Sequence, residues 1–223
     1  MSGEPLGFVH RYEPASGPGR PTLLLLHGTG GDEHDLLPLG RLLAPGAALL
    51  SPRGNVMERG APRFFRRFAE GVFDTADVAR RAAELAEFIE AASARYGFAP
   101  RSVIAVGFSN GANIAGAVLL LHPAVLRTAA LFRAQMVVDA SQIPPGAVAL
   151  AATRVFLAAG RTDPIVPATE SERLARALRD RGADVTLRWD DAGHTLSKGD
   201  IEEAASWIAT TTDDARWSTL GEA

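Results

Sequence analysis

Residues 102–121 constrain the fold of this chain most, because they predict a strand, a sharp turn and a helix in direct succession. The largely apolar run 102–106 leads into Gly107-Phe108-Ser109-Asn110-Gly111, and an apolar helical segment over 112–121 follows. In this context Gly-x-Ser-x-Gly places a serine at the exposed apex of a strained turn, and its glycines let strand and helix approach closely. Glycine-rich turns between strands and helices are common, however, so the motif has to be weighed with the rest of the chain.

The other segments alternate between short apolar runs and helical periodicity. The continuous apolar run at residues 22–26 and the similar run at 154–159 are typical of strands buried on both faces. Further strands are predicted at residues 47–51, 128–132 and 184–189, and a weak alternation predicts an edge strand at 7–12. Further helices are predicted at residues 35–43, 74–96, 169–182 and 200–210. Strands that alternate with helices predict an α/β fold, with a mostly parallel, doubly wound sheet covered by helices on both faces.

Local signals mark several of the predicted helix ends. Asp35 suits the N-cap of the first helix, where Pro38 is tolerated in the first turn. Gly97 suits the C-terminal cap of the helix that begins near Asp74, and residues 169–172 have the Thr-x-x-Glu spacing of a capping box. Since no linker, repeat or long insertion for a cap domain is visible, residues 1–223 are expected to form one domain.

Composition excludes several classes of function. The chain has no cysteine, which rules out disulfides, thiolate metal sites and a cysteine nucleophile. A net charge of -3 argues against a nucleic-acid-binding surface. The N-terminus lacks the basic and apolar regions of a signal peptide, and no apolar run is long enough to span a bilayer. We therefore expect a cytoplasmic protein that neither binds nucleic acid nor spans a membrane.

Four polar loops follow predicted strands, and they carry Thr29, Ser109, Asp163 and His194. In a doubly wound sheet, ligands bind beyond the carboxyl ends of the strands, where these loops lie. A serine nucleophile needs a base within hydrogen-bond reach and a carboxylate that fixes the tautomer of that base. The chain order Ser, Asp, His therefore predicts Ser109 as nucleophile, His194 as base and Asp163 as the orienting acid.

Plainer explanations exist for the base and the acid. His194 could be a surface-loop histidine, although the only other histidine after the serine is His122, at the far end of the following helix. Asp163 could simply form an Asx turn before a proline. Asp190 and Asp191 are alternative orienting acids, but they share a loop with His194, from which its Nδ1 is awkward to reach.

Acyl transfer also requires fixed N–H donors for the charge that develops on the carbonyl oxygen, and losing one donor costs about 10²–10³ in rate. The backbone N–H of Asn110, directly after the serine, is one expected donor. The glycine-rich loop over residues 27–31 predicts the second donor at Thr29. This loop has neither the G-x-G-x-x-G spacing nor the Gly-Lys-Ser/Thr ending of a phosphate-binding loop.

Two further stretches invite functional interpretations. Residues 32–35, Asp-Glu-His-Asp, include metal-ligating types, but neighbours on one turn do not converge on one ion, so no metal is expected. Residues 53–73 interleave five arginines with Phe64, Phe65 and Phe68. They could form a flap that lines a pocket and meets an anionic substrate. We favour a partly buried loop whose phenylalanines point inward and whose arginines are solvated or paired.

The motifs considered together resemble the phospholipase/carboxylesterase family, compact α/β-hydrolases related to acyl-protein thioesterases. The resemblance rests on Leu-His-Gly-Thr-Gly-Gly-Asp-Glu at 26–33, Ser-Pro-Arg-Gly-Asn at 51–55, the serine motif, Gly-Arg-Thr-Asp-Pro-Ile-Val-Pro at 160–167 and Gly-His at 193–194. It covers the chain from about residue 23 to 194. Residues 51–55 together with Pro-Arg-Phe-Phe-Arg-Arg at 62–67 are similar to a bacterial branch associated with hydroquinone-stress hydrolases.

This resemblance implies a catalytic triad of Ser109, Asp163 and His194, with Thr29 and Asn110 as oxyanion donors. It also implies a carboxylic-ester substrate, no cofactor and often a homodimer. Many members have glutamine where this chain has Asn110, and thioesterase relatives often have leucine where Thr29 stands. Both differences leave a backbone donor in place, so they bear on substrate preference and not on mechanism.

The sequence thus predicts a serine hydrolase that cleaves small carboxylic esters through an acyl-enzyme on Ser109. Without an insertion for a cap, its pocket should be open and suited to short acyl or aryl esters. A thioesterase or deacylase acting on protein-bound or coenzyme-bound acyl groups would use the same residues. A non-catalytic binding module would keep the fold, but it would not require the serine, the acid and the base together.

Overall fold

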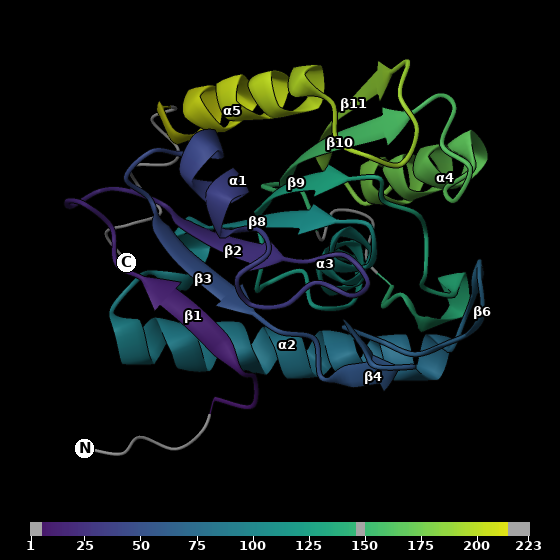
Figure 1. Cartoon of the computed structure of the whole chain (residues 1–223), viewed down its shortest axis with the longest axis horizontal. Coiled ribbons are helices and arrows are strands. Elements are labelled where there is room, and N and C mark those ends of the chain that lie inside the picture. Colours follow the sequence, from purple (N-terminus) through teal and green to yellow (C-terminus); the bar gives the residue numbers. More distant parts are fainter. Residues whose placement is uncertain (1–5, 146–149, 214–223) are drawn as a thin grey trace.

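A seven-stranded sheet forms the centre of the computed structural model, which describes residues 6–145 and 150–213 (Figure 1). Its strand order is β1-β3-β2-β8-β9-β10-β11. These strands are β1 (His10–Glu13), β2 (Thr22–Leu26), β3 (Ala48–Pro52), β8 (Val103–Phe108), β9 (Thr128–Phe132), β10 (Arg154–Gly160) and β11 (Asp184–Asp190). Only β1 runs antiparallel to its neighbour in this sheet, which confirms the predicted α/β fold with a mostly parallel sheet.

Helices lie on both faces of this sheet, as predicted (Figure 1). One face is covered by α2 (Thr75–Tyr96), α3 (Asn110–Leu121) and α4 (Ala168–Arg179), and the other by α1 (Leu37–Leu43) and α5 (Lys198–Asp213). Leu24 and Leu26 of β2 point to the first face, and Leu23 and Leu25 point to the second. A strand buried on both faces needs apolar side chains at every position, which explains the continuous run of leucines.

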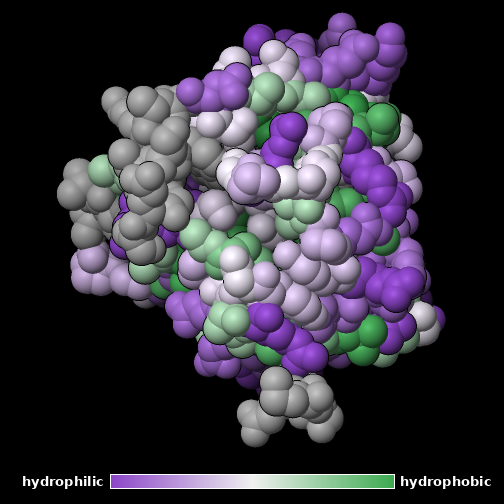
Figure 2. Space-filling view, turned by 90° about the vertical axis from the view of Figure 1, so that its left-hand side faces the viewer, coloured by the Kyte–Doolittle hydropathy of each residue, from purple (hydrophilic) through white to green (hydrophobic). Residues whose placement is uncertain are grey.

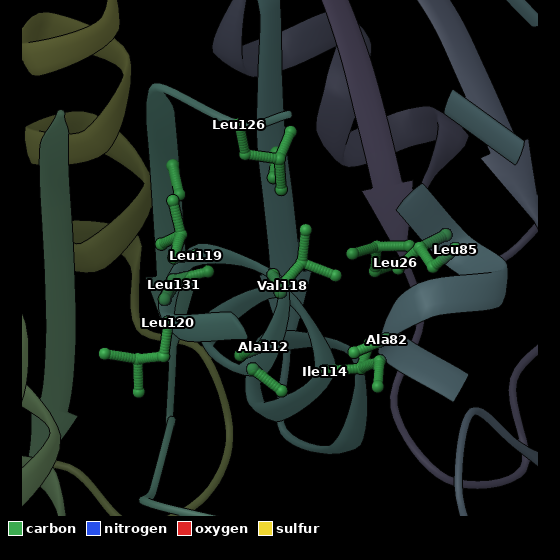
Figure 3. Close-up of a cluster of buried hydrophobic side chains, with 14 of the residues drawn as sticks. Leu26, Ala82, Leu85, Ala112, Ile114, Val118, Leu119, Leu120, Leu126 and Leu131 are labelled. Carbon is green, nitrogen blue, oxygen red and sulfur yellow. The ribbon is translucent and has the colours of Figure 1, made fainter. Parts of the chain in front are cut away.

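The core beneath α2 and α3 is built from side chains of both helices and of the strands (Figure 3). Leu26 from β2, Ala82 and Leu85 from α2, and Ile114 and Val118 from α3 converge there, and all five are fully buried. This packing seats α3 directly behind the carboxyl ends of β2 and β8, where Ser109 lies.

The predicted ends of α2 are confirmed by its capping interactions. Asp74 is the N-cap, and its side chain accepts a hydrogen bond from the Asp77 backbone N–H (3.1 Å). Gly97 ends the helix in the left-handed conformation, with φ of 73°. The predicted edge strand at 7–12 is displaced and lies at His10–Glu13. The last helix is longer than the predicted 200–210.

Two predicted N-terminal caps are wrong. The N-cap of α1 is Leu36 without a side-chain bond, because Asp35 still belongs to the preceding turn and its carboxylate lies against Gly31. The α4 helix already begins at Ala168 after Pro167, so residues 169–172 lie inside it and form no capping box. Instead, the buried Ser171 hydroxyl donates to the Ala134 carbonyl (2.9 Å).

Residues 53–73, which we call the hairpin segment, are more regular than the predicted loop. They contain β4 (Val56–Glu58) paired with β5 (Ala61–Arg63), and β6 (Arg67–Ala69) paired with β7 (Val72–Phe73). In Figure 1, β4 and β6 lie on the side toward which the arrows of β8, β9 and β10 point. Phe64 and Phe65 are buried as predicted, whereas Phe68 is 70% exposed and does not point inward.

The opposite side of the molecule, at the amino ends of the parallel strands, mixes hydrophilic residues with small hydrophobic patches (Figure 2). No helix within residues 6–145 and 150–213 combines the length and the apolar character that crossing a membrane requires.

Candidate active site

Ser109 occupies a strained turn between β8 and α3, with φ of 51° and ψ of -115°. Such a conformation is unfavourable for a residue with a side chain, and it persists only where the surroundings enforce it. A Cβ at Gly111 would lie 1.9 Å from the Leu26 carbonyl oxygen, and one at Gly107 would lie 2.6 Å from the Ala112 Cα. Only glycines therefore allow this close approach of strand and helix around the serine.

Three side chains from separate loops meet at this turn. His194 Nε2 lies 2.9 Å from Ser109 Oγ, and His194 Nδ1 lies 2.8 Å from Asp163 Oδ2. The Asp163 side chain is 1% exposed and that of His194 is 17% exposed. A neutral imidazole that donates from Nδ1 to the carboxylate has Nε2 free to accept the serine proton. The structure thus brings together the three residues that the chain order singled out.

Asp163 both forms an Asx turn and contacts the histidine. Its Oδ1 accepts the backbone N–H groups of Ile165 (2.8 Å) and Val166 (3.0 Å), while Oδ2 faces His194. The two interpretations that the sequence left open are therefore compatible, because each uses a different oxygen. Backbone donors on Oδ1 hold the carboxylate in one orientation toward the imidazole.

The alternative acids are engaged elsewhere. Asp190, the last residue of β11, contacts the Ser197 hydroxyl through Oδ2. Asp191 forms an ion pair with Arg161 (3.3 Å), and its side chain is 89% exposed. Neither has a hydrogen bond to His194 among the described residues.

The loop after β2 lies against the serine turn, because β2 and β8 are parallel neighbours whose carboxyl ends coincide. A Cβ at Gly28 would lie 2.8 Å from the Phe108 ring. Asn110 is the first residue of α3, so its N–H has no acceptor within the helix and lies at the positive end of the helix dipole. The Thr29 N–H has no hydrogen bond within residues 6–145 and 150–213.

The hairpin segment holds both candidate oxyanion donors through three consecutive residues. The Pro62 carbonyl accepts the N–H of Gly30 (3.0 Å), directly after Thr29. Arg63 Nη1 donates to the Thr29 hydroxyl (2.7 Å). The Phe64 N–H donates to the Asn110 side-chain oxygen (2.7 Å). The segment is thus attached to the loop after β2 and to the start of α3 at the same time.

Most arginines of the hairpin segment have the predicted acidic partners. Arg53 pairs with Glu33, Arg66 with Asp74 and Arg67 with Glu58. Arg63 also pairs with Glu58 (3.1 Å), but its side chain is only 3% exposed. Its Nε donates to the Phe65 carbonyl (3.2 Å), and burial lowers the pKa of its guanidinium. The sequence did not distinguish Arg63 from its neighbours, because nothing in the local pattern shows which arginine is enclosed.

His27 joins the loop after β2 to the start of the hairpin segment. Its Nδ1 lies 2.6 Å from the Gly28 carbonyl oxygen, so Nδ1 carries the proton and donates. The Gly54 N–H donates to Nε2 (3.0 Å), which is therefore an acceptor. Burial lowers the pKa of His27, in agreement with a neutral ring that uses both nitrogens.

The acidic cluster at residues 32–35 makes contacts within its own loop and with its neighbours. Asp32 accepts the His34 N–H (2.8 Å), and Glu33 lies 3.7 Å from His34 Nε2 and 3.4 Å from Arg53 Nε. Among the described residues, no group of three or more histidine, aspartate or glutamate side chains is arranged to hold a metal ion.

A cavity of about 550 Å³ opens beside the site. Pro164 and Ile165, which directly follow Asp163, form part of its wall, and the hairpin β6–β7 and residues 135–139 form the remainder with the start of α4. Its lining mixes apolar side chains such as Val72 and Met136 with charged ones. Ser109 and His194 do not line it, so the cavity adjoins the hydrogen-bonded residues without enclosing them.

A family model for phospholipases and carboxylesterases matches residues 10–212. The chain belongs to this family. The resemblance seen in the motifs is thus confirmed. This chain is also 46% identical over 198 residues to the hydrolase MhqD of Bacillus subtilis (strain 168), and the alignment covers 89% of this chain and 96% of that protein.

Solved structures agree with the family. The Bacillus cereus carboxylesterase matches the present protein with a TM-score of 0.86 at 42% identity, over 91% of this chain and 94% of that one. A carboxylesterase from Mesorhizobium loti matches with a TM-score of 0.85 at 33% identity, over 92% and 96% of the two chains. The arrangement of sheet and helices is thus shared along nearly the full length of these relatives.

Proposed function

We propose that this hydrolase cleaves carboxylic esters through an acyl-enzyme on Ser109. The observation that carries the proposal is the hydrogen-bonded series from Asp163 through His194 to Ser109, with distances of 2.8 and 2.9 Å. A serine that is held in a strained turn beside a base and an orienting acid is the arrangement that nucleophilic catalysis requires. Family membership and the carboxylesterases among the solved structures support an ester as substrate.

In the first half of the reaction, Ser109 Oγ attacks the ester carbonyl carbon and its proton passes to His194 Nε2. Asp163 accepts the Nδ1 proton in a hydrogen bond and stabilises the imidazolium that forms. The carbonyl oxygen becomes negative, and the N–H groups of Thr29 and Asn110 are the proposed donors to it. When the tetrahedral intermediate collapses, Nε2 returns the proton to the leaving alcohol.

The second half repeats these steps with water. His194 takes a proton from a water molecule, which attacks the acyl carbon, and the same N–H donors stabilise the second oxyanion. Ser109 leaves with the proton from Nε2, and the carboxylic acid is released. The ester and one water molecule are consumed, the alcohol and the carboxylic acid are released, and the side chains return to their starting protonation states.

A fluorophosphonate probe tests the nucleophile directly, because it phosphonylates an activated serine irreversibly. We expect one adduct, on Ser109, and Ser109→Ala should lose labelling and at least about 10³-fold in ester turnover. Ser102→Ala is the matched control. Ser102 directly precedes β8, at the end of the strand opposite to Ser109, and its hydroxyl donates to the Ala99 carbonyl (2.8 Å).

An adduct at any other residue, or ester turnover that survives in Ser109→Ala, would contradict the proposal. The same assay should compare oxygen esters and thioesters that have the same acyl group. Faster turnover of the thioester would assign the same nucleophile to a thioesterase instead.

A further inference from the structure

Arg133 lies at the carboxyl end of β9, next to the candidate site, and its side chain is fully buried. Its backbone is in the left-handed region, with φ of 55°, and its N–H donates to the Ala158 carbonyl of β10 (2.8 Å). Burying a charged group is costly unless it is paired and hydrogen-bonded, and a left-handed conformation adds strain. Arg133 combines both, so its contacts need a specific explanation.

Each of the five N–H groups that a guanidinium can donate has an acceptor. Nε donates to the Gly193 carbonyl (2.8 Å) and Nη2 to the Thr195 carbonyl (2.8 Å). Nη1 donates to the Ala158 carbonyl (3.2 Å). The remaining two N–H groups form a bidentate pair with Asp200, from Nη1 to Oδ1 (3.3 Å) and from Nη2 to Oδ2 (2.6 Å).

Two of these acceptors flank the candidate base. Gly193 and Thr195 are the residues directly before and after His194, so the guanidinium holds the backbone on both sides of the imidazole. The residue before Arg133 is Phe132, whose carbonyl accepts the Ser109 N–H (2.9 Å). Phe132 therefore contacts the backbone of the candidate nucleophile, and Arg133 contacts the backbone of the two residues that flank the candidate base.

The pair with Asp200 extends this connection to the start of α5. Asp200 Oδ2 also accepts the Ser197 N–H (2.9 Å), and the Ser197 hydroxyl accepts the Asp200 N–H (3.0 Å). These reciprocal bonds have the pattern of a capping box, which defines where the helix begins. The guanidinium of Arg133 is thus hydrogen-bonded both to the residues around His194 and to the first turn of α5.

We propose that Arg133 is a positioning residue that sets the distance and orientation of His194 Nε2 relative to Ser109 Oγ. This inference rests on the proposed function. It extends that function by assigning the placement of His194 to a residue outside the proposed triad. Arg133 acts through the backbone of Gly193 and Thr195 and does not touch the reacting atoms.

Arg133→Lys is the decisive variant, because it keeps the charge but cannot reach both carbonyls and Asp200 with a single nitrogen. A misplacement of the base by about 1 Å lowers turnover by about 10²-fold, and we expect a loss of that order in kcat with little change in KM. The number of sites that a phosphonate finally titrates should equal that of the wild type. A purely structural role would instead lower the number of titratable sites.

The leaving group provides a second readout. The imidazolium must protonate a poor leaving alcohol, whereas p-nitrophenolate departs without that help. Arg133→Lys should therefore slow an alkyl ester more than the matching p-nitrophenyl ester. A larger loss on the p-nitrophenyl ester than on the alkyl ester would contradict the positioning role.

A double-mutant cycle with His194→Ala separates this inference from the proposed function. If Arg133 acts through His194, Arg133→Lys should change the residual activity of His194→Ala by less than about threefold, because groups that act as a unit are not additive. The same loss in both backgrounds would overturn the inference and leave the proposed function intact. Full activity in His194→Ala alone would overturn the proposed function itself.

Asp200→Asn keeps the inference testable if Arg133→Lys does not fold. It retains the arginine and its bonds to the two carbonyls but removes the charge that orients it, so a smaller loss of about threefold to tenfold is expected. That loss should also vanish in the His194→Ala background, and its persistence there would contradict the inference. Arg188→Lys is the control, because Arg188 forms an ion pair at the surface with Glu203 of α5, the helix that also carries Asp200. This variant should leave turnover unchanged.

Discussion

At the scale of single residues, buried arginines support the two halves of the candidate site. Arg133 contacts the backbone on both sides of His194, and Arg63 contacts the side chain of Thr29. An arginine suits such positions because its rigid, planar group can satisfy several acceptors in fixed directions. Loss of either should therefore affect geometry before it affects the fold.

For Arg63, we expect Arg63→Met to lower the acylation rate by about tenfold, less than the 10²–10³ that loss of a whole oxyanion donor costs. Methionine keeps an apolar stem but leaves the Thr29 hydroxyl without its donor. The rate of phosphonate labelling, which develops charge on a similar oxygen, should fall in parallel with kcat/KM.

The matched control is Arg67→Met. Arg67 pairs with the same Glu58, at 3.1 Å, but has no contact with Thr29. It should retain wild-type rates, and equal losses in the two variants would show that Glu58 alone matters.

At the scale of elements, the junction of β8 and α3 depends on how closely the helix approaches β2. Gly111→Ala would place a Cβ 1.9 Å from the Leu26 carbonyl oxygen, which belongs to the backbone and cannot rotate away. Overpacking of this kind costs about 1–3 kcal/mol, and we expect the free energy of unfolding to fall by at least that amount. The urea midpoint, at an unchanged m-value, measures the effect.

Gly116→Ala in the middle of the same helix is the comparison. Its Cβ would meet only the Leu174 side chain, at 3.5 Å, which is an ordinary contact. Removing a helical glycine should stabilise the protein by about 0.5–1 kcal/mol. Destabilisation of both variants to the same extent would contradict the close approach at Gly111.

At the scale of the whole molecule, His27 couples stability to pH. Burial lowers its pKa from 6.5 in the folded state, so the unfolded chain binds a proton at a pH where the folded protein does not. The contribution of the neutral imidazole to the free energy of unfolding is fully present above about pH 6.5, and it is lost as the pH falls through the folded-state pKa. The free energy of unfolding should therefore decrease between about pH 7 and about pH 5.

Urea unfolding of His27→Gln at the two pH values checks this expectation. Because the variant has no imidazole at this position, its loss of stability on acidification should be smaller than that of the wild type. An identical pH dependence of the variant and the wild type would contradict the role of His27.

The order along the chain of the α-helices and of the strands in the central sheet follows from the sequence pattern, whereas the four short strands β4–β7 do not. Short continuous apolar runs are typical of strands buried on both faces, and parallel strands bring their carboxyl ends to one edge. This is why Ser109, Asp163 and His194 could be selected before any distance was known, and why the family motifs were readable. The prediction failed where the pattern was only local, as at Asp35 and residues 169–172, whose neighbours begin the helices differently.

The local sequence does not predict which charged side chains are enclosed beside the site. Arg133 meets Asp200, which is 67 positions away, and Arg63 meets Thr29, which is 34 positions away. A buried charge is tolerated only when distant segments supply acceptors for it, and the local sequence carries no record of those partners. The chain order therefore singled out the triad candidates, and the packing around them shows which buried arginines contact the segments that carry the candidate site.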